Sequence, residues 1–135
     1  MTAPYTGGCQ CGSVSYVVTA EPIRVSACHC KECQRQSGSA FAMSMPVKKD
    51  SLTVTGLTKQ FTRIADSGNE VTCVFCPECG VRLYHTLQSA PDVLALKPGT
   101  LDDTSWLRPA SFIWTKSAQG WVPVPDGVEA LEGQN

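Results

Sequence analysis

Cysteines are gathered into short clusters along this chain, and no other feature constrains the fold as strongly. Eight cysteines occur in 135 residues. Seven of them form three clusters, Cys9 and Cys11; Cys28, Cys30 and Cys33; and Cys76 and Cys79, while Cys73 stands slightly apart before the last cluster. Core packing gives no reason for such spacings, whereas short gaps let neighbouring thiolates converge on one tetrahedral metal ion. The clusters therefore predict a protein that binds zinc.

Composition excludes several classes of protein. The net charge is −1 and charged residues make up 17% of the chain, so neither a nucleic-acid surface nor a polybasic membrane patch is expected. The longest uncharged stretch, 1–20, is interrupted by polar residues and glycine, unlike a membrane span or a secretory signal. We therefore expect one domain over 1–135 and a cytoplasmic location, where thiols stay reduced.

Disulfide bonds and redox chemistry are the alternative uses of these cysteines. Four bridges would leave two long stretches, 34–72 and 80–135, without a cross-link, so we favour metal binding. Cys76-Pro77-Glu78-Cys79 also has the spacing of a redox pair, but it lacks the strand-then-helix context of thioredoxin-like motifs.

Short segments of alternating apolar and polar residues predict a mainly β fold with very little helix. We expect strands near 13–19, 41–45, 51–55, 60–64, 70–75, 81–86, 93–96 and 112–115, with turns at Pro46, Gly56, 66–69 and 98–99. One short helix is expected over 29–36, ended by Gly38 in a left-handed conformation. The polar tail at 126–135 is expected to be loosely held.

Seven clustered cysteines exceed the four ligands of one zinc site, so we expect two sites. Cys76 to Gly80 is typical of a zinc knuckle, because the proline stiffens the turn and the glycine allows a positive φ. A knuckle supplies two ligands, and the glycine-flanked pair Cys9 and Cys11 is the natural source of two more. A closed site of four thiolates, completed by Cys79, is expected to be structural.

The remaining cluster, Cys28, Cys30 and Cys33, predicts a second zinc with one open position, as in catalytic sites. Three thiolates on a divalent ion leave a net charge of about −1, which suits holding another thiol rather than making hydroxide. Cys73 or His29 as a fourth ligand would instead close a second structural site. We expect His29 to point away from the metal toward solvent, and Cys73 to be an ordinary half-buried thiol.

Three motifs stand in an order that resembles a known family. They are Gly8-Cys9-Gln10-Cys11-Gly12; Cys28-His29-Cys30-Lys31-Glu32-Cys33 followed by Ser37-Gly38-Ser39-Ala40-Phe41; and Phe75-Cys76-Pro77-Glu78-Cys79-Gly80. The chain is similar to the glutathione-dependent formaldehyde-activating enzymes (GFA), a family that includes centromere protein V. Phe112-Ile113-Trp114 and Trp121 also resemble the family's closing strands.

The resemblance implies a β-tent of short antiparallel strands with two zinc ions. In the family the first and last cysteine motifs hold a structural zinc and the central motif holds a catalytic zinc, which agrees with the partition above. The implied activity is that of a carbon–sulfur lyase acting on a thiol adduct of a small carbonyl, such as S-hydroxymethylglutathione. Cys73 is an addition to the usual pattern.

Two functions from different classes follow. In the first, the central zinc binds a thiol substrate such as glutathione, and neighbouring polar residues orient one of its carboxylates: Lys31, Glu32, Gln34 and Arg35. In the second, both zinc ions are structural and the domain is a non-catalytic module that binds a protein partner through its tryptophans, Trp106, Trp114 and Trp121. The fourth ligand of the central site distinguishes the two functions.

Overall fold

The computed structural model describes residues 2–134, and the fold over this range is mainly β, as the sequence predicts. The strands are β1 (Tyr5–Gly8), β2 (Ser15–Val18), β3 (Ser26–Cys28), β4 (Ala42–Lys48), β5 (Leu52–Thr55), β6 (Lys59–Ile64), β7 (Glu70–Phe75), β8 (Arg82–Leu87), β9 (Val93–Leu96), β10 (Ser111–Ile113) and β11 (Glu129–Ala130). The helical segments are α1 (Lys31–Ser37) and the 3-10 turns η1 (Lys49–Ser51), η2 (Pro98–Thr100) and η3 (Thr115–Ser117).

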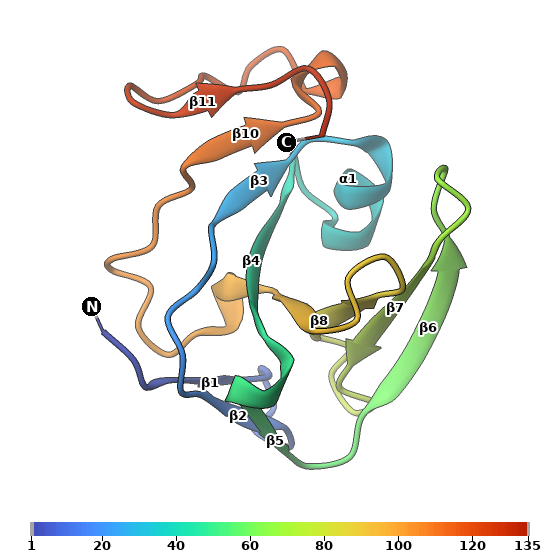
Figure 1. The fold of residues 1–135 in the computed structure, drawn as a ribbon, viewed down its shortest axis with the longest axis vertical. Coiled ribbons are helices and arrows are strands. Elements are labelled where there is room, and N and C mark those ends of the chain that lie inside the picture. Colours follow the sequence, from blue (N-terminus) through green and yellow to red (C-terminus); the bar gives the residue numbers. More distant parts are fainter. Residues whose placement is uncertain (1, 135) are drawn as a thin grey trace.

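The strands form two sheets. The smaller has the order β1-β2-β5 and the larger the order β11-β10-β3-β4-β9-β8-β7-β6. Figure 1 shows the small sheet at one end of the molecule and α1 near the other. Within residues 2–134, none of the helical segments has the length and hydrophobicity of a membrane span.

Strand β4 joins the two halves of the large sheet by changing partner along its length. It pairs with β3 over Ala42–Ser44 and with β9 over Met45–Lys48. The core lies where this sheet packs against the small one, and its buried members include Tyr16, Val18, Met45, Leu83 and Leu96. Alternation along the strands predicts these buried faces correctly, since successive side chains point to opposite sides of a strand.

The short helix is also confirmed, although it begins two residues later than expected. Cys30 is the N-cap residue of α1, and its sulfur accepts a hydrogen bond from the Cys33 N–H. Gly38 ends the helix with φ 62°, a left-handed conformation that glycine adopts without steric cost.

The prediction of a turn at Pro46 is wrong, because Pro46 lies inside β4 opposite Ala95 of β9. Its carbonyl accepts a hydrogen bond from the Ile23 N–H at 2.8 Å. Since the N and C=O of one residue point to the same side of a strand, the missing N–H of Pro46 faces Ile23 rather than β9. The proline therefore removes no hydrogen bond from the pairing with β9.

The C-terminal region differs from the expected loose tail. Strand β11 pairs with β10, and beyond it the Leu131 N–H donates to the Phe112 carbonyl at 2.8 Å. Residue 135 lies outside the described residues. Strand β10 also departs from the implied antiparallel arrangement, because it runs parallel to both β3 and β11. Long connections precede and follow β10, and parallel pairing requires such connections.

Candidate metal centres

Four cysteines from distant parts of the chain meet in the first cluster. The Sγ atoms of Cys9, Cys11, Cys76 and Cys79 all lie within 4.8 Å of one another. The separation is 3.6 Å between Cys9 and Cys11 and 3.7 Å between Cys11 and Cys76. A tetrahedral zinc with bonds of about 2.3 Å to sulfur requires edges of about 3.8 Å. The donor set and its spacing fit a zinc ion.

Tight turns bring these sulfurs into place. The Cys9 N–H donates to the Val14 carbonyl at 3.0 Å, and the Val14 N–H donates back to the Cys9 sulfur at 3.3 Å. In the knuckle, the Gly80 N–H donates to the Cys76 carbonyl at 2.9 Å and the Glu78 N–H donates to the Cys76 sulfur at 3.4 Å. Gly80 has φ 79°, the positive value expected from the sequence.

Hydrogen bonds to the Cys9 sulfur favour its thiolate form. Burial acts in the opposite direction, but the Val14 N–H and the neighbouring thiols outweigh it and lower the pKa of Cys9 to about 6. The Cys79 N–H acts to lower the pKa of Cys76, but burial and hydrogen bonds with the Cys79 and Cys11 thiols raise it to about 11. Metal binding requires deprotonated cysteines, and Cys9 is thus more readily deprotonated than Cys76.

The second cluster is built at the junction of β3 and α1. The Sγ atoms of Cys28, Cys30 and Cys33 also lie within 4.8 Å of one another. Hydrogen bonds from Cys28 and Cys33 lower the pKa of Cys30, and the bond to Cys30 raises the pKa of Cys28. Cys30 is therefore the thiol of this cluster that loses its proton most readily.

His29 lies beside this cluster but is not one of its grouped ligand atoms. Its side chain is fully buried between Phe41 and Phe112, whose ring centroids lie 5.2 Å and 4.7 Å from that of the imidazole. The expected exposure to solvent is therefore wrong. Burial lowers the pKa of His29, which favours the neutral ring. Because His29 alternates with Cys28 and Cys30 along the chain, its ring points away from their sulfurs, as expected. On the opposite side it packs against Phe41 and Phe112.

Cys73 is fully buried on β7, opposite His85 of β8, rather than half-buried as expected. It belongs to neither cluster. Among residues 2–134, no fourth Cys, His, Asp or Glu joins Cys28, Cys30 and Cys33 in the grouping. The second cluster therefore offers three sulfur ligands from the protein.

Three residues near the second cluster were not predicted from the sequence. The Gln36 side-chain amide donates to the Cys33 sulfur at 3.6 Å, and an Arg82 N–H donates to the Gln36 carbonyl oxygen at 3.3 Å. Burial lowers the pKa of Lys97, while the charges of Cys33, Cys73 and Cys28 act to raise it. Arg82 and Lys97 follow no recognisable motif. Arg82 begins β8 and Lys97 directly follows β9, and the pairing of these two strands continues to the Lys97 N–H, which donates to the Leu83 carbonyl at 2.8 Å.

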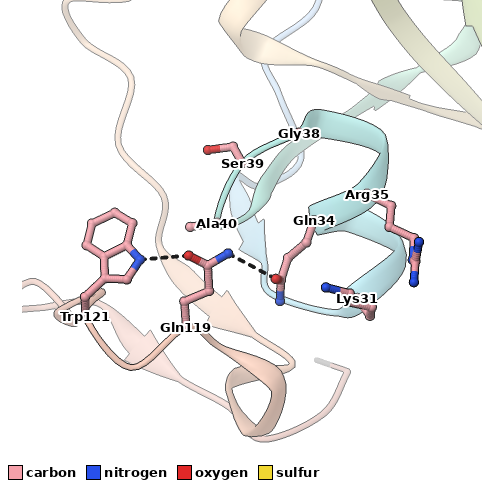
Figure 2. Close-up of a pocket in the computed structure, with 8 residues that line it drawn as sticks. All are labelled: Lys31, Gln34, Arg35, Gly38, Ser39, Ala40, Gln119 and Trp121. Carbon is pink, nitrogen blue, oxygen red and sulfur yellow. Dashed lines mark hydrogen bonds between the residues drawn. The ribbon is translucent and has the colours of Figure 1, made fainter.

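Three of the four polar residues expected to orient the substrate line one hollow, and Glu32 is not among its lining residues. Lys31, Gln34 and Arg35 line a hollow of about 410 Å³ that Trp121 also lines, shown in Figure 2. Gln34 is buried, and its amide donates to the carbonyls of His29 at 2.9 Å and Ser117 at 3.0 Å. Its role is thus to anchor the loop that carries the second cluster.

Trp121 departs from its expected place in a closing strand. It lies outside the strands, 71% exposed, and its indole N–H donates to Gln119 at 2.7 Å. The Gln119 amide in turn donates to Gln34 at 3.2 Å, as Figure 2 shows. Trp106, in contrast, stacks on Tyr5 at a centroid distance of 5.1 Å.

Comparison with known proteins agrees with the family resemblance of the cysteine motifs. The chain is 26% identical over 126 residues to a putative glutathione-dependent formaldehyde-activating enzyme of Podospora anserina, covering 88% of this chain and 59% of that protein. It is 30% identical over 82 residues to one of Emericella nidulans, covering 59% of this chain and 41% of that protein. The chain thus spans about half the length of these two relatives.

Three further comparisons extend the match. A Penicillium rubens protein of the same description is 26% identical over 129 residues, covering 88% of this chain and 67% of that protein. A crystal structure of a Rhodobacter sphaeroides protein shares the fold, with a TM-score of 0.58 and 22% identity, covering 72% of this chain and 87% of that chain. Residues 4–117 match the model of the glutathione-dependent formaldehyde-activating enzyme family. The chain belongs to this family.

Proposed function

We propose that this chain is a zinc-dependent carbon–sulfur lyase that acts on the adduct of a thiol and a small carbonyl, such as S-hydroxymethylglutathione. The observation that carries the proposal is the second cluster, where three cysteine sulfurs converge and no fourth protein ligand joins them within residues 2–134. Catalytic zinc sites characteristically keep one position open in this way. The relatives' names supply the expected thiol and carbonyl, glutathione and formaldehyde.

The two clusters are assigned different roles. Cys9, Cys11, Cys76 and Cys79 would hold a structural zinc, and Cys28, Cys30 and Cys33 would hold a catalytic zinc. Bound there, the catalytic ion would supply an open, soft position that stabilises the substrate sulfur as thiolate. The protein's cysteines set the charge of that position, and Gln36 donates a hydrogen bond to one of them.

The reaction balances without an oxidant or a reductant. In the direction of synthesis the thiol loses its proton, and a sulfur lone pair forms the new bond to the carbonyl carbon. The π electrons of the carbonyl move to its oxygen, which takes up a proton. Cleavage of the adduct is the reverse. Such chemistry suits the reducing cytoplasm, the compartment that we propose for this chain.

The competing proposal, a non-catalytic module that binds a protein partner, has the exposed Trp121 in its favour. Zinc stoichiometry and the spectrum of the cobalt-substituted protein distinguish the two. We expect two metal ions per chain, one of whose absorption bands changes when glutathione is added. We also expect the protein to accelerate the combination of formaldehyde with glutathione, followed by NMR, and Cys33→Ser to abolish this acceleration. If two metal ions are bound but glutathione changes neither absorption spectrum, and the protein does not accelerate adduct formation, the proposed lyase is refuted and the non-catalytic module is favoured.

A further inference from the structure

A second hollow, of about 430 Å³, lies beside the Cys28 cluster and shares no lining residue with the hollow of Figure 2. Its walls come from the end of α1, the start of β4, the start of β8 and the segment at η2. The residues that matter for the argument are Gln36, Phe41, Met43, Val81, Arg82 and Lys97. Apolar walls with a few polar groups are typical of sites for small molecules.

The hollow is electropositive. Arg82 and Lys97 both line it, and its lining includes no Asp or Glu. Lys97 donates to the Met43 carbonyl at 3.4 Å and Arg82 donates to the Gln36 amide, and neither forms an ion pair with a carboxylate in the described part of the chain. Two half-buried cations without acidic partners favour an anionic ligand.

Charge balance assigns the two cations different tasks. Three thiolates on a divalent ion carry about −1, and Lys97 interacts electrostatically with Cys28 and Cys33 of that cluster. Lys97 therefore offsets the charge of the loaded cluster. Arg82 remains for the ligand, and its planar guanidinium matches the geometry of a carboxylate.

Gln36 connects Arg82 to the cluster. Its amide nitrogen donates to the Cys33 sulfur at 3.6 Å and its oxygen accepts from Arg82 at 3.3 Å. A molecule in the hollow therefore contacts residues that are one hydrogen bond away from a candidate metal ligand. Gln36 also restricts the orientation of the guanidinium, which reduces the entropy that binding must overcome.

We propose that this hollow binds the body of the thiol substrate, and that Arg82, oriented by Gln36, binds one of its carboxylates. The substrate class is then a thiol with at least one carboxylate, whose carbon chain packs against Phe41, Met43 and Val81. The inference rests on the proposed function, because it places the substrate sulfur at the Cys28 cluster. It differs from the sequence-based expectation, which gave this task to the residues around Lys31 and Arg35.

The test is a titration of the cobalt-substituted protein, followed by its absorption spectrum, with glutathione and with glutathione diethyl ester. The ester keeps the thiol and the peptide but loses both carboxylate charges. We expect glutathione to bind at least about tenfold more tightly than the ester, because the ester offers no carboxylate charge for Arg82 to bind. Arg82→Gln should remove this preference, and Arg82→Lys should restore part of it. Arg63→Gln is the matched control, because Arg63 lies on β6 and lines neither hollow.

The outcomes separate this inference from the proposed function. Glutathione binding that is equal in the wild type and in Arg82→Gln would overturn the inference while leaving the thiol site intact. Arg35→Gln is measured in the same way. If this variant, and not Arg82→Gln, loses the preference for glutathione over the ester, the inference is overturned and the hollow of Figure 2 is favoured. A spectrum that responds to neither compound in any variant would refute the proposed function itself. Two metal ions per chain in every variant verify that the fold is intact.

Discussion

Replacing Cys76 by serine should cost much more stability than replacing Cys33 by serine, although each change removes one thiolate. The sulfurs of Cys11 and Cys76 lie 3.7 Å apart and belong to residues 65 positions apart in the chain. Restricting a loop of that length removes entropy from the unfolded chain worth about 4 kcal/mol, by the relation used for disulfide cross-links. Cys28 and Cys33 are only five positions apart, for which the same relation gives about 2 kcal/mol.

Burial adds to this difference. Cys76 is fully buried within the main core, whereas Cys33 is half-buried at the surface of α1. The difference of about 2 kcal/mol in loop entropy is a large part of a typical stability of about 5–15 kcal/mol. For a domain of this size it corresponds to a difference in Tm of roughly 8 °C.

The measurement is thermal unfolding by circular dichroism, together with the zinc content of each purified variant. Cys33→Ser should keep one zinc per chain and most of the wild-type Tm. Cys76→Ser should lose the other zinc and unfold at a markedly lower temperature. Cys73→Ser is the stoichiometric control, because Cys73 belongs to neither cluster and should leave two zinc ions bound. Equal losses of Tm in the two ligand variants would refute the division into a structural and a catalytic site.

Two other predictions concern packing and pH. Gly7→Ala should destabilise the protein by about 3 kcal/mol in urea titrations, because its Cβ would overlap the Thr100 carbonyl oxygen and the Tyr16 hydroxyl, whereas Gly120→Ala, with open space around it, should change little. Burial, aided by nearby cations, lowers the pKa of His85 from 6.5 to about 2, so the unfolded chain binds protons more readily than the folded one. The free energy of unfolding is therefore unaffected by this group above pH 6.5 and falls as the pH falls, because the unfolded chain takes up the proton first. The loss is about 1.4 kcal/mol at about pH 5.5. His85→Asn should lose less stability than the wild type over this interval in urea titrations, and an identical pH dependence would contradict the assignment.

Local patterns predicted local structure well. The strand over 70–75 and the strand over 93–96 agree with β7 and β9, because each is a short segment whose alternation and flanking turns lie within a few residues. Predictions failed where the deciding contact is distant in the chain. The sequence predicts a turn at Pro46, yet the hydrogen bond from the Ile23 N–H and the pairing with β9 make this residue part of a strand. The polar composition of 126–135 predicts a loosely held tail, yet β11 within it pairs with β10.

The same division holds for the site. Ligand spacing is a local property, so the three cysteine clusters, and the grouping of Cys28, Cys30 and Cys33 around one helical turn, followed from the sequence alone. The surroundings of that cluster did not, because Arg82 comes from β8, Lys97 from the residue after β9, and Phe112, which packs on His29, from far along the chain. Cysteine spacing determined which ligand the clusters suit, since thiolates that lie this close together are a donor set for a metal ion. Only strand pairing decided which charges and which hollow lie beside them, because long-range contacts depend on the whole chain.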